Sequence, residues 1–164
     1  MFSRVTVFAA LVALIVPGTA WAQGSQIAFG NMQQDSSLPV EVTADNLDVD
    51  QTDGTAVFTG NVRIGQGEMR LSAPRVVVVY KEDKSGIARL RASGGVTLVS
   101  GPDAAEAARA DYAIDTGMIE MQGDVLLLQG ANALSAEWMT VDTRAGTARM
   151  SGRVKTVIQQ GEDQ

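Results

Sequence analysis

The chain has 164 residues and a formal net charge of −6, and it contains neither cysteine nor histidine. The absence of cysteine excludes disulfide frameworks, thiolate nucleophiles and thiolate metal sites, and the absence of histidine removes the commonest general base and metal ligand. The net negative charge argues against nucleic acid as a partner, and we predict no enzymatic activity, no metal site and no cofactor.

Residues 1–22 have the pattern of a secretory signal peptide. Arg4 gives a basic start, residues 5–16 are apolar, and residues 20–22 form an Ala-Trp-Ala cleavage pattern. The apolar run is shorter than the about 20 residues that a membrane-spanning helix needs. We therefore expect export, cleavage after Ala22 and a mature chain that begins at Gln23. A protein that keeps the run as a membrane anchor is the alternative.

Residues 23–39 are rich in Gln, Ser, Gly and Asn, with only scattered apolar side chains. This composition predicts a flexible N-terminal arm rather than a packed element. From Val40 to Ile158, apolar residues recur mainly with period two and are interrupted by Gly, Asp, Asn and Ser, which predicts many short β-strands. We place one domain at residues 40–158 and a flexible tail at residues 159–164.

An internal repeat runs through this domain. Its motif is apolar, any, apolar, any, Gly, any, Val, and it occurs at residues 56–62, 90–96, 119–125 and 148–154. The motif recurs about every thirty residues, with an insertion near residues 81–85. Each unit holds several short strands and cannot bury its apolar face alone, so the units must stack into one continuous β structure.

The alternation of apolar and polar residues predicts antiparallel strands with one dry and one solvated face. Two such sheets facing each other would form a sandwich or an elongated open roll. Aromatic residues make up only 5% of the chain, and methionines such as Met69 and Met121 adapt to irregular apolar ligands. Ordinary core packing and an apolar groove both remain open at this point.

Three segments resemble the OstA-like family of periplasmic lipopolysaccharide transport proteins, the LptA type. They are residues 42–50, residues 54–62 and residues 69–73, in an order and spacing similar to the family pattern. The resemblance covers nearly the whole domain. It implies an all-β fold: an antiparallel β-jellyroll bent into an open, taco-like V and built here from about four repeats.

The resemblance also implies a function. A protein of this kind would be a non-enzymatic periplasmic carrier or bridge that moves lipopolysaccharide from the inner to the outer membrane and shelters the acyl chains of lipid A. Its implied partners are lipopolysaccharide, an inner-membrane-anchored protein of the same fold, the N-terminal domain of the outer-membrane assembly barrel, and further copies joined head to tail.

Strand phase selects the residues that we expect to line the apolar groove and bind lipid. They are Val62, Ile64, Met69, Leu71, Val76, Val78, Leu98, Val125, Leu127, Leu134, Met139 and Val141. The residues expected at the joints between subunits are Val40, Val42, Leu47, Val154 and Ile158.

Three other functions compete with the carrier. The first is a membrane-anchored protein of the same fold in the same pathway. The second is a structural β-repeat module with a filled core and no ligand. The third is a glycosidase that uses paired carboxylates, such as Asp48 with Asp50 or Asp111 with Asp115. Because these carboxylates lie in and beside repeated turns, capping or solvated roles are favoured over catalysis.

Overall fold

The computed structural model describes residues 26–30 and 37–159. The predicted signal peptide, the rest of the predicted arm before Ser37 and most of the predicted tail lie outside the described residues. Within the described part of the chain, every regular element is a β-strand, and all strands belong to one antiparallel sheet. This part also contains no helix that could span a membrane.

Eleven strands build the sheet. They are β1 (Gln26–Ala28), β2 (Glu41–Thr43), β3 (Asn46–Asp50), β4 (Thr55–Gln66), β5 (Met69–Tyr80), β6 (Ile87–Ser100), β7 (Asp103–Ala113), β8 (Met118–Gln129), β9 (Asn132–Asp142), β10 (Thr147–Ser151) and β11 (Lys155–Val157). Strands β4 to β10 pair in chain order. Both β2 and β3 pair with β4, both β10 and β11 pair with β9, and β1 pairs with β10.

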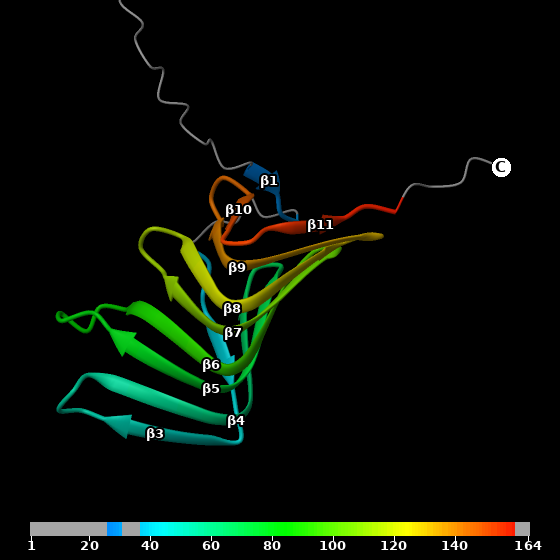
Figure 1. Ribbon diagram of the computed structural model, residues 1–164. Coiled ribbons are helices and arrows are strands. Elements are labelled where there is room, and N and C mark those ends of the chain that lie inside the picture. The colour runs from blue at the N-terminus through cyan, green and yellow to red at the C-terminus, as the bar shows by residue number, and fades with distance from the viewer. Residues whose placement is uncertain (1–25, 31–36, 160–164) are drawn as a thin grey trace, which may run out of the picture.

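The long strands bend in the middle, and this crease divides the sheet into two halves that face each other as a V (Figure 1). Pairing between neighbouring strands shifts register at the crease, for example between Thr59 and Val62. Half-sheet I contains β2, β11 and the parts of β4 to β9 on their side of the crease. Half-sheet II contains β1, β3, β10 and the remaining parts of β4 to β9.

The repeated glycines are the residues at which the chain turns through the crease. Gly60, Gly94, Gly123 and Gly152 all have positive φ, between 78° and 91°. The residue after each glycine also has positive φ. A pair of left-handed residues reorients a strand strongly, and glycine adopts this conformation at little cost. The motif found in the sequence is therefore the device that bends the sheet.

The inner faces of the two half-sheets form the apolar core. It contains valine, leucine, isoleucine, methionine and alanine from every strand between β4 and β10. Alternation along each strand leaves charged side chains on the outer surface, as expected for a sheet that is dry on one face only. The prediction of an antiparallel all-β jellyroll in an open V is confirmed.

One sequence prediction is wrong. Residues 26–28 were expected in a flexible arm, but they form β1, which pairs with β10. Phe29 follows this strand and is fully buried. A strand of three residues is too short to produce a periodic pattern, and the polar composition around it concealed the two apolar side chains, Ile27 and Phe29, that carry its packing.

Candidate functional site

The register of the sheet arranges the inner side chains in rows that cross the strands. One row in half-sheet I runs through Ile64, Leu71, Leu98, Ala105, Leu127 and Leu134. Two rows in half-sheet II run through Phe58, Val76, Ala92, Ala110, Met121, Met139 and Met150, and through Ala56, Val78, Leu90, Tyr112, Ile119, Val141 and Ala148. Each row is apolar from β4 to its last strand, so the interior is continuous along the molecule.

All twelve residues predicted to line a groove belong to this interior. Eleven of them are buried, and Leu134, near the edge strand β11, is half-buried. Period-two alternation therefore selected the inner face of the strands that contain these residues, which are β4, β5, β6, β8 and β9. Their contact with lipid remains a prediction, because burial alone does not distinguish a lipid-binding wall from a core.

In this structure the middle of the interior is packed rather than open. Leu98, Met121, Val125 and Leu127 have exposed fractions of 0%. Side chains on facing half-sheets therefore cover one another, and an acyl chain could enter only if the half-sheets moved apart. Strand β7 contributes small inner side chains, since Ala105, Ala107 and Ala110 are all alanine. These alanines were not among the residues expected to line the groove.

A buried hydrogen bond joins the two half-sheets. The Tyr112 hydroxyl on half-sheet II donates to Oε1 of Gln66 on half-sheet I, at 2.7 Å. The Gln66 side-chain amide in turn donates to the Leu38 carbonyl. Burial raises the pKa of the Tyr112 phenol, while a hydrogen bond with Thr143 and the charge of Arg144 oppose that rise. This pair, which we call the latch, was not predicted from the sequence.

A second connection between the half-sheets follows β1. The Phe29 N–H donates to the Gly146 carbonyl on half-sheet II, and the Gly30 N–H donates to the Asp103 carboxylate on half-sheet I at 2.6 Å. The Gln129 side-chain amide donates both to the Ala28 carbonyl and to Asp103. We call residues 26–30 the strap, because they pass from one half-sheet to the other.

The two ends of the sheet expose apolar side chains. At the β3 end, Leu47 is 53% exposed and Val49 is 62% exposed. At the β11 end, Val154 and Ile158 are 50% and 68% exposed. Among the other residues predicted to form joints, Val40 and Val42 are half-buried against the core. Exposed apolar residues on edge strands suit pairing with another chain.

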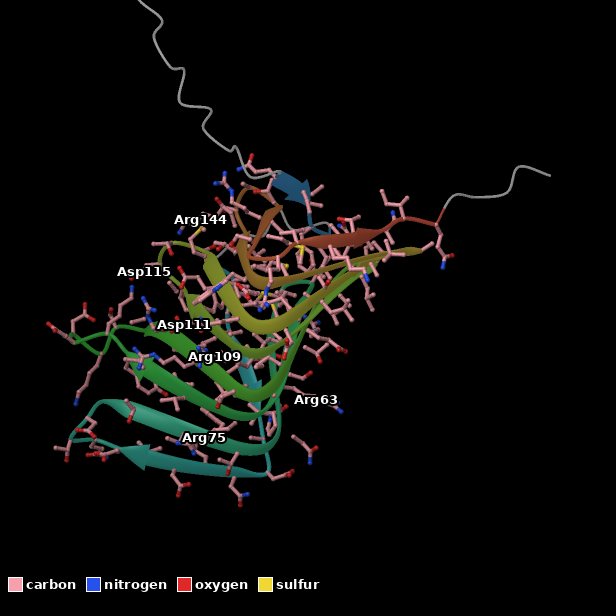
Figure 2. All side chains as sticks on the ribbon, in the orientation of Figure 1. Arg63, Arg75, Arg109, Asp111, Asp115 and Arg144 are labelled. Carbon is pink, nitrogen blue, oxygen red and sulfur yellow. The ribbon has the colours of Figure 1, made fainter. Side chains whose placement is uncertain are left out.

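Three of the four acidic residues considered for catalysis, Asp50, Asp111 and Asp115, make structural contacts. Asp111 forms ion pairs with Arg89 and Arg91. Asp115 pairs with Lys81, and its backbone carbonyl accepts a hydrogen bond from Arg144, which lies beside it in Figure 2.

A carboxylate of this group also caps a turn. Asp50 accepts the Thr52 and Asp53 N–H groups in the turn after β3. No cluster of three or more acidic residues able to hold a metal ion occurs among residues 26–30 and 37–159.

The strand arrangement and the sequence lead to the same family. The family model described as "LptA/(LptD N-terminal domain) LPS transport protein" matches residues 41–147. The chain belongs to this family. Membership confirms the resemblance seen in residues 42–50, 54–62 and 69–73, and it assigns the chain to lipopolysaccharide transport proteins rather than to enzymes.

Individual relatives agree with this assignment. An uncharacterized protein of Rhizobium meliloti (strain 1021) is 27% identical over 155 residues, which are 94% of this chain and 71% of that protein. The lipopolysaccharide export system protein LptH of Pseudomonas aeruginosa is 33% identical over 72 residues, which are 44% of this chain and 39% of LptH.

A solved structure has the same fold. The crystal structure of LptH, described as the LptA-homologous periplasmic component of the conserved lipopolysaccharide transport device from Pseudomonas aeruginosa, matches with a TM-score of 0.69. The sequence identity is 20%, and the match covers 77% of this chain and 99% of that chain. At this identity the likeness supports the fold alone.

Proposed function

We propose that this chain is a periplasmic carrier of lipopolysaccharide that holds the acyl chains of lipid A between its half-sheets. One observation carries the proposal: apolar rows run without interruption along a sheet that is folded at a crease rather than closed into a barrel. A folded sheet can open at its mouth while its strands stay paired.

The energetic need for such an interior is large. Exposing one methylene group to water costs about 0.8 kcal/mol, so a chain of about a dozen carbons costs on the order of 10 kcal/mol. The net charge of the protein is negative, which opposes binding of a phosphorylated headgroup. Apolar contacts with the acyl chains must therefore supply most of the binding free energy.

Entry of an acyl chain requires the half-sheets to separate. The latch between Tyr112 and Gln66 holds them together away from the crease, since Gln66 ends β4 and Tyr112 is the second-last residue of β7. A single neutral hydrogen bond contributes about 0.5–1.5 kcal/mol net, which is small beside the burial of an acyl chain. Methionines in the wall, such as Met121 and Met139, can repack around an inserted chain.

We also propose that copies join end to end. Strand β11 runs away from the crease and β2 runs toward it, so β11 of one copy and β2 of the next lie antiparallel when their creases are aligned. The same holds for β10 and β3. Such a stack extends both half-sheets and covers Leu47 and Val154, which are exposed in the single chain.

The outer partners in this proposal are an inner-membrane-anchored protein of the same fold at one end and an LptD-type N-terminal domain at the other. The family description, which includes the LptD N-terminal domain, supports the second of these partners. A cleaved signal peptide is part of the proposal. The mass of the N-terminus of the exported protein tests it, because an uncleaved chain would indicate a membrane-anchored protein of the pathway.

Photo-crosslinking tests lipid binding directly. A photoreactive residue is placed at Leu134, which lies in the interior yet is only half-buried, and at Leu127 in the packed middle. Lys155 is the control, because it is exposed and lies opposite Ser135, the outward neighbour of Leu134.

With lipopolysaccharide present, we expect adducts at both interior positions and none at Lys155. Absence of adducts at both positions in folded protein would contradict the carrier function. That result would favour a structural repeat module with a permanently filled core, which the tight packing of the middle also fits.

A further inference from the structure

We infer that the strap is a built-in competitor for end-to-end joining: β1 occupies the edge of β10 that β3 of a second copy needs. The inference rests on the proposed joining of copies, and it adds a step that regulates this joining. Strand β1 precedes the part of the chain that matches the family model, which begins at residue 41.

The register identifies the position that β1 occupies. Ile27 lies opposite Ala148 on β10, just as Val78 of β5 lies opposite Ala56 on β4. In the repeat, Ala148 and Ala56 are equivalent positions, four residues before the crease glycine. Strand β1 thus pairs with the last strand of the repeat in half-sheet II, β10, at the edge where the next strand of a further repeat would pair.

In half-sheet II, the edge strand that a following copy would present is β3. Its Val49 is the repeat equivalent of Val78, since each is the second inner residue of the strand that leaves the crease. Placed on β10 of another copy, β3 would set Val49 where Ile27 now lies. Val49 is 62% exposed in the single chain and would then be buried in the same apolar row.

Strand direction shows that β3 cannot simply add outside β1. Residue 28 of β1 pairs near the β9–β10 turn and residue 26 pairs nearer the crease, so β1 runs away from the crease. Strand β3 also runs away from the crease. The two would be parallel, whereas β3 on the bare edge of β10 would be antiparallel, like the rest of the sheet.

The crease gives a second reason why β1 must leave before two copies join. In half-sheet I, β11 is the end strand at this side among the described residues, and β2 of the next copy would pair with it directly. In half-sheet II, β1 adds one extra strand. The half-sheets would then be out of step by one strand spacing, about 4.8 Å. Both joints form together only after β1 leaves.

The strap makes enough contacts with the sheet to compete with an incoming strand, but few enough for that strand to displace it. It makes three residue pairs with β10 and buries Phe29 completely. Its contacts also include hydrogen bonds from Phe29 to Gly146, from Gly30 to Asp103 and from Gln129 to Ala28. A short edge strand of this kind belongs to the low-stability end of local opening. An incoming β3 has five residues to pair with β10, whereas β1 has three.

A disulfide lock tests the competition. The chain contains no cysteine. Within one chain, the cysteines introduced by Ala28→Cys and Thr147→Cys can therefore form a disulfide only with each other. These residues are direct partners in the β1–β10 register, and such partners have Cα atoms about 4.5–5.5 Å apart, within disulfide range. The matched control is Thr140→Cys with Arg149→Cys, a direct pair between β9 and β10 that leaves the strap unbound.

Sedimentation velocity over a concentration series measures self-association of the purified protein. We expect the oxidised lock to stay monomeric where the unmodified protein forms chains, and reductant to restore association. The control pair should associate in both redox states. Equal association of the oxidised lock and the unmodified protein would overturn the competition while leaving end-to-end joining intact.

A second variant releases the strap. In Phe29→Ala the strap loses its buried anchor, and we expect self-association to tighten about tenfold or more, as when a binding-competent state becomes fully populated. Association that is weaker than in the unmodified protein would overturn the inference. If neither the unmodified protein nor this variant associates at any concentration, end-to-end joining fails together with the inference, whereas the lipid-crosslinking result stands separately.

Discussion

The two edges of half-sheet II are complementary positions of the repeat, since β3 corresponds to β5 and β10 corresponds to β4, but their surroundings differ. At the first edge, β3 leaves Leu47 and Val49 more than half exposed. At the last edge, the strap covers β10, and Ala148 is 1% exposed. A repeat protein must end somewhere, and its terminal units require a cap or a partner. This chain caps one edge with its own strand and leaves the other ready for a partner.

The difference between the edges separates residues that hold the fold from residues that are available for joining. Residues in the closed middle should have large effects on stability and residues at the bare edge small ones, with the capped edge between them.

The middle of the interior should tolerate no charge. Leu127→Asp places a carboxylate among side chains that are fully buried, and an unpaired buried charge costs several kcal/mol. We expect a loss of more than about 4 kcal/mol, enough to unfold a typical domain of this size in part. Urea denaturation followed by circular dichroism measures the loss.

The neighbouring leucine provides the control for this substitution. Leu128 lies on the outer face and is 40% exposed. Leu128→Asp should change the free energy of unfolding by about 0.5 kcal/mol or less. Similar losses for the two variants would show that the faces of β8 are wrongly assigned and that the interior is not the dry side of the sheet.

Much of this gradient could be predicted from the sequence. Period-two alternation identified the inner side chains, and the repeated Gly identified equivalent positions, although not that Gly60 and its counterparts form the crease. These are local properties, since a strand's phase and a left-handed residue are encoded within a few positions. The family resemblance added the open V, which alternation alone left undecided between a sandwich and a roll.

Three features could not be predicted, each because it depends on distant residues. The latch joins Tyr112 to Gln66 across the fold, and no periodicity links them. The strap is too short to have a pattern, and its partner β10 lies far along the chain. The closure of the interior depends on the angle between the half-sheets, on which the alternation of side chains carries no information.

Replacement of the crease glycine by alanine should lower stability equally at the two ends of the sheet. An added Cβ would lie 2.9 Å from the Asp45 Cβ at Gly60 and 2.8 Å from the Glu137 Cβ at Gly152. Both glycines have φ near +80°. We expect Gly60→Ala and Gly152→Ala to cost about 2–3 kcal/mol each, from left-handed strain plus steric contact.

Gly54→Ala separates strain from contact. Gly54 also has positive φ, but no atom lies within 4 Å of its added Cβ. We expect a cost of about 1 kcal/mol from the backbone conformation alone. Thermal unfolding of the three variants ranks them. Equal costs for all three would indicate that the close approach at the crease contributes nothing.

A substitution in the strap should cost more stability than one at the bare edge, because the side chain that it removes is more deeply buried. Phe29→Ala removes a fully buried ring at the capped edge. We expect a loss of about 1–3 kcal/mol, less than the 3–5 kcal/mol of a central Phe→Ala change, because the strap can detach without unfolding the sheet. Leu47→Ala removes a side chain that is 53% exposed and should cost about 0.5 kcal/mol or less.

Hydrogen exchange distinguishes local detachment from global loss in these variants. In Phe29→Ala, amide protection should fall on β10 while β5 to β8 remain protected. A uniform fall in protection across the sheet would show that the strap is an integral part of the core rather than a removable cap.

The latch should give a small effect, and one that depends on pH. Burial raises the pKa of Tyr112 in the folded protein, so the folded state keeps its proton to higher pH than the unfolded state does. The contribution is complete below the unfolded pKa of about 10 and is lost as pH rises through the folded pKa. Free energy of unfolding should therefore fall at alkaline pH.

Tyr112→Phe removes both the titrating group and the hydrogen bond to Gln66. We expect a loss of about 1 kcal/mol at neutral pH and a flatter decline above about pH 10. Tyr80→Phe is the control, because Tyr80 is the other tyrosine of the chain and is 41% exposed. If the latch restrains opening, Tyr112→Phe also increases lipid crosslinking at Leu134 relative to Tyr80→Phe. Unchanged crosslinking together with an unchanged alkaline decline would show that the latch does not hold the two half-sheets together.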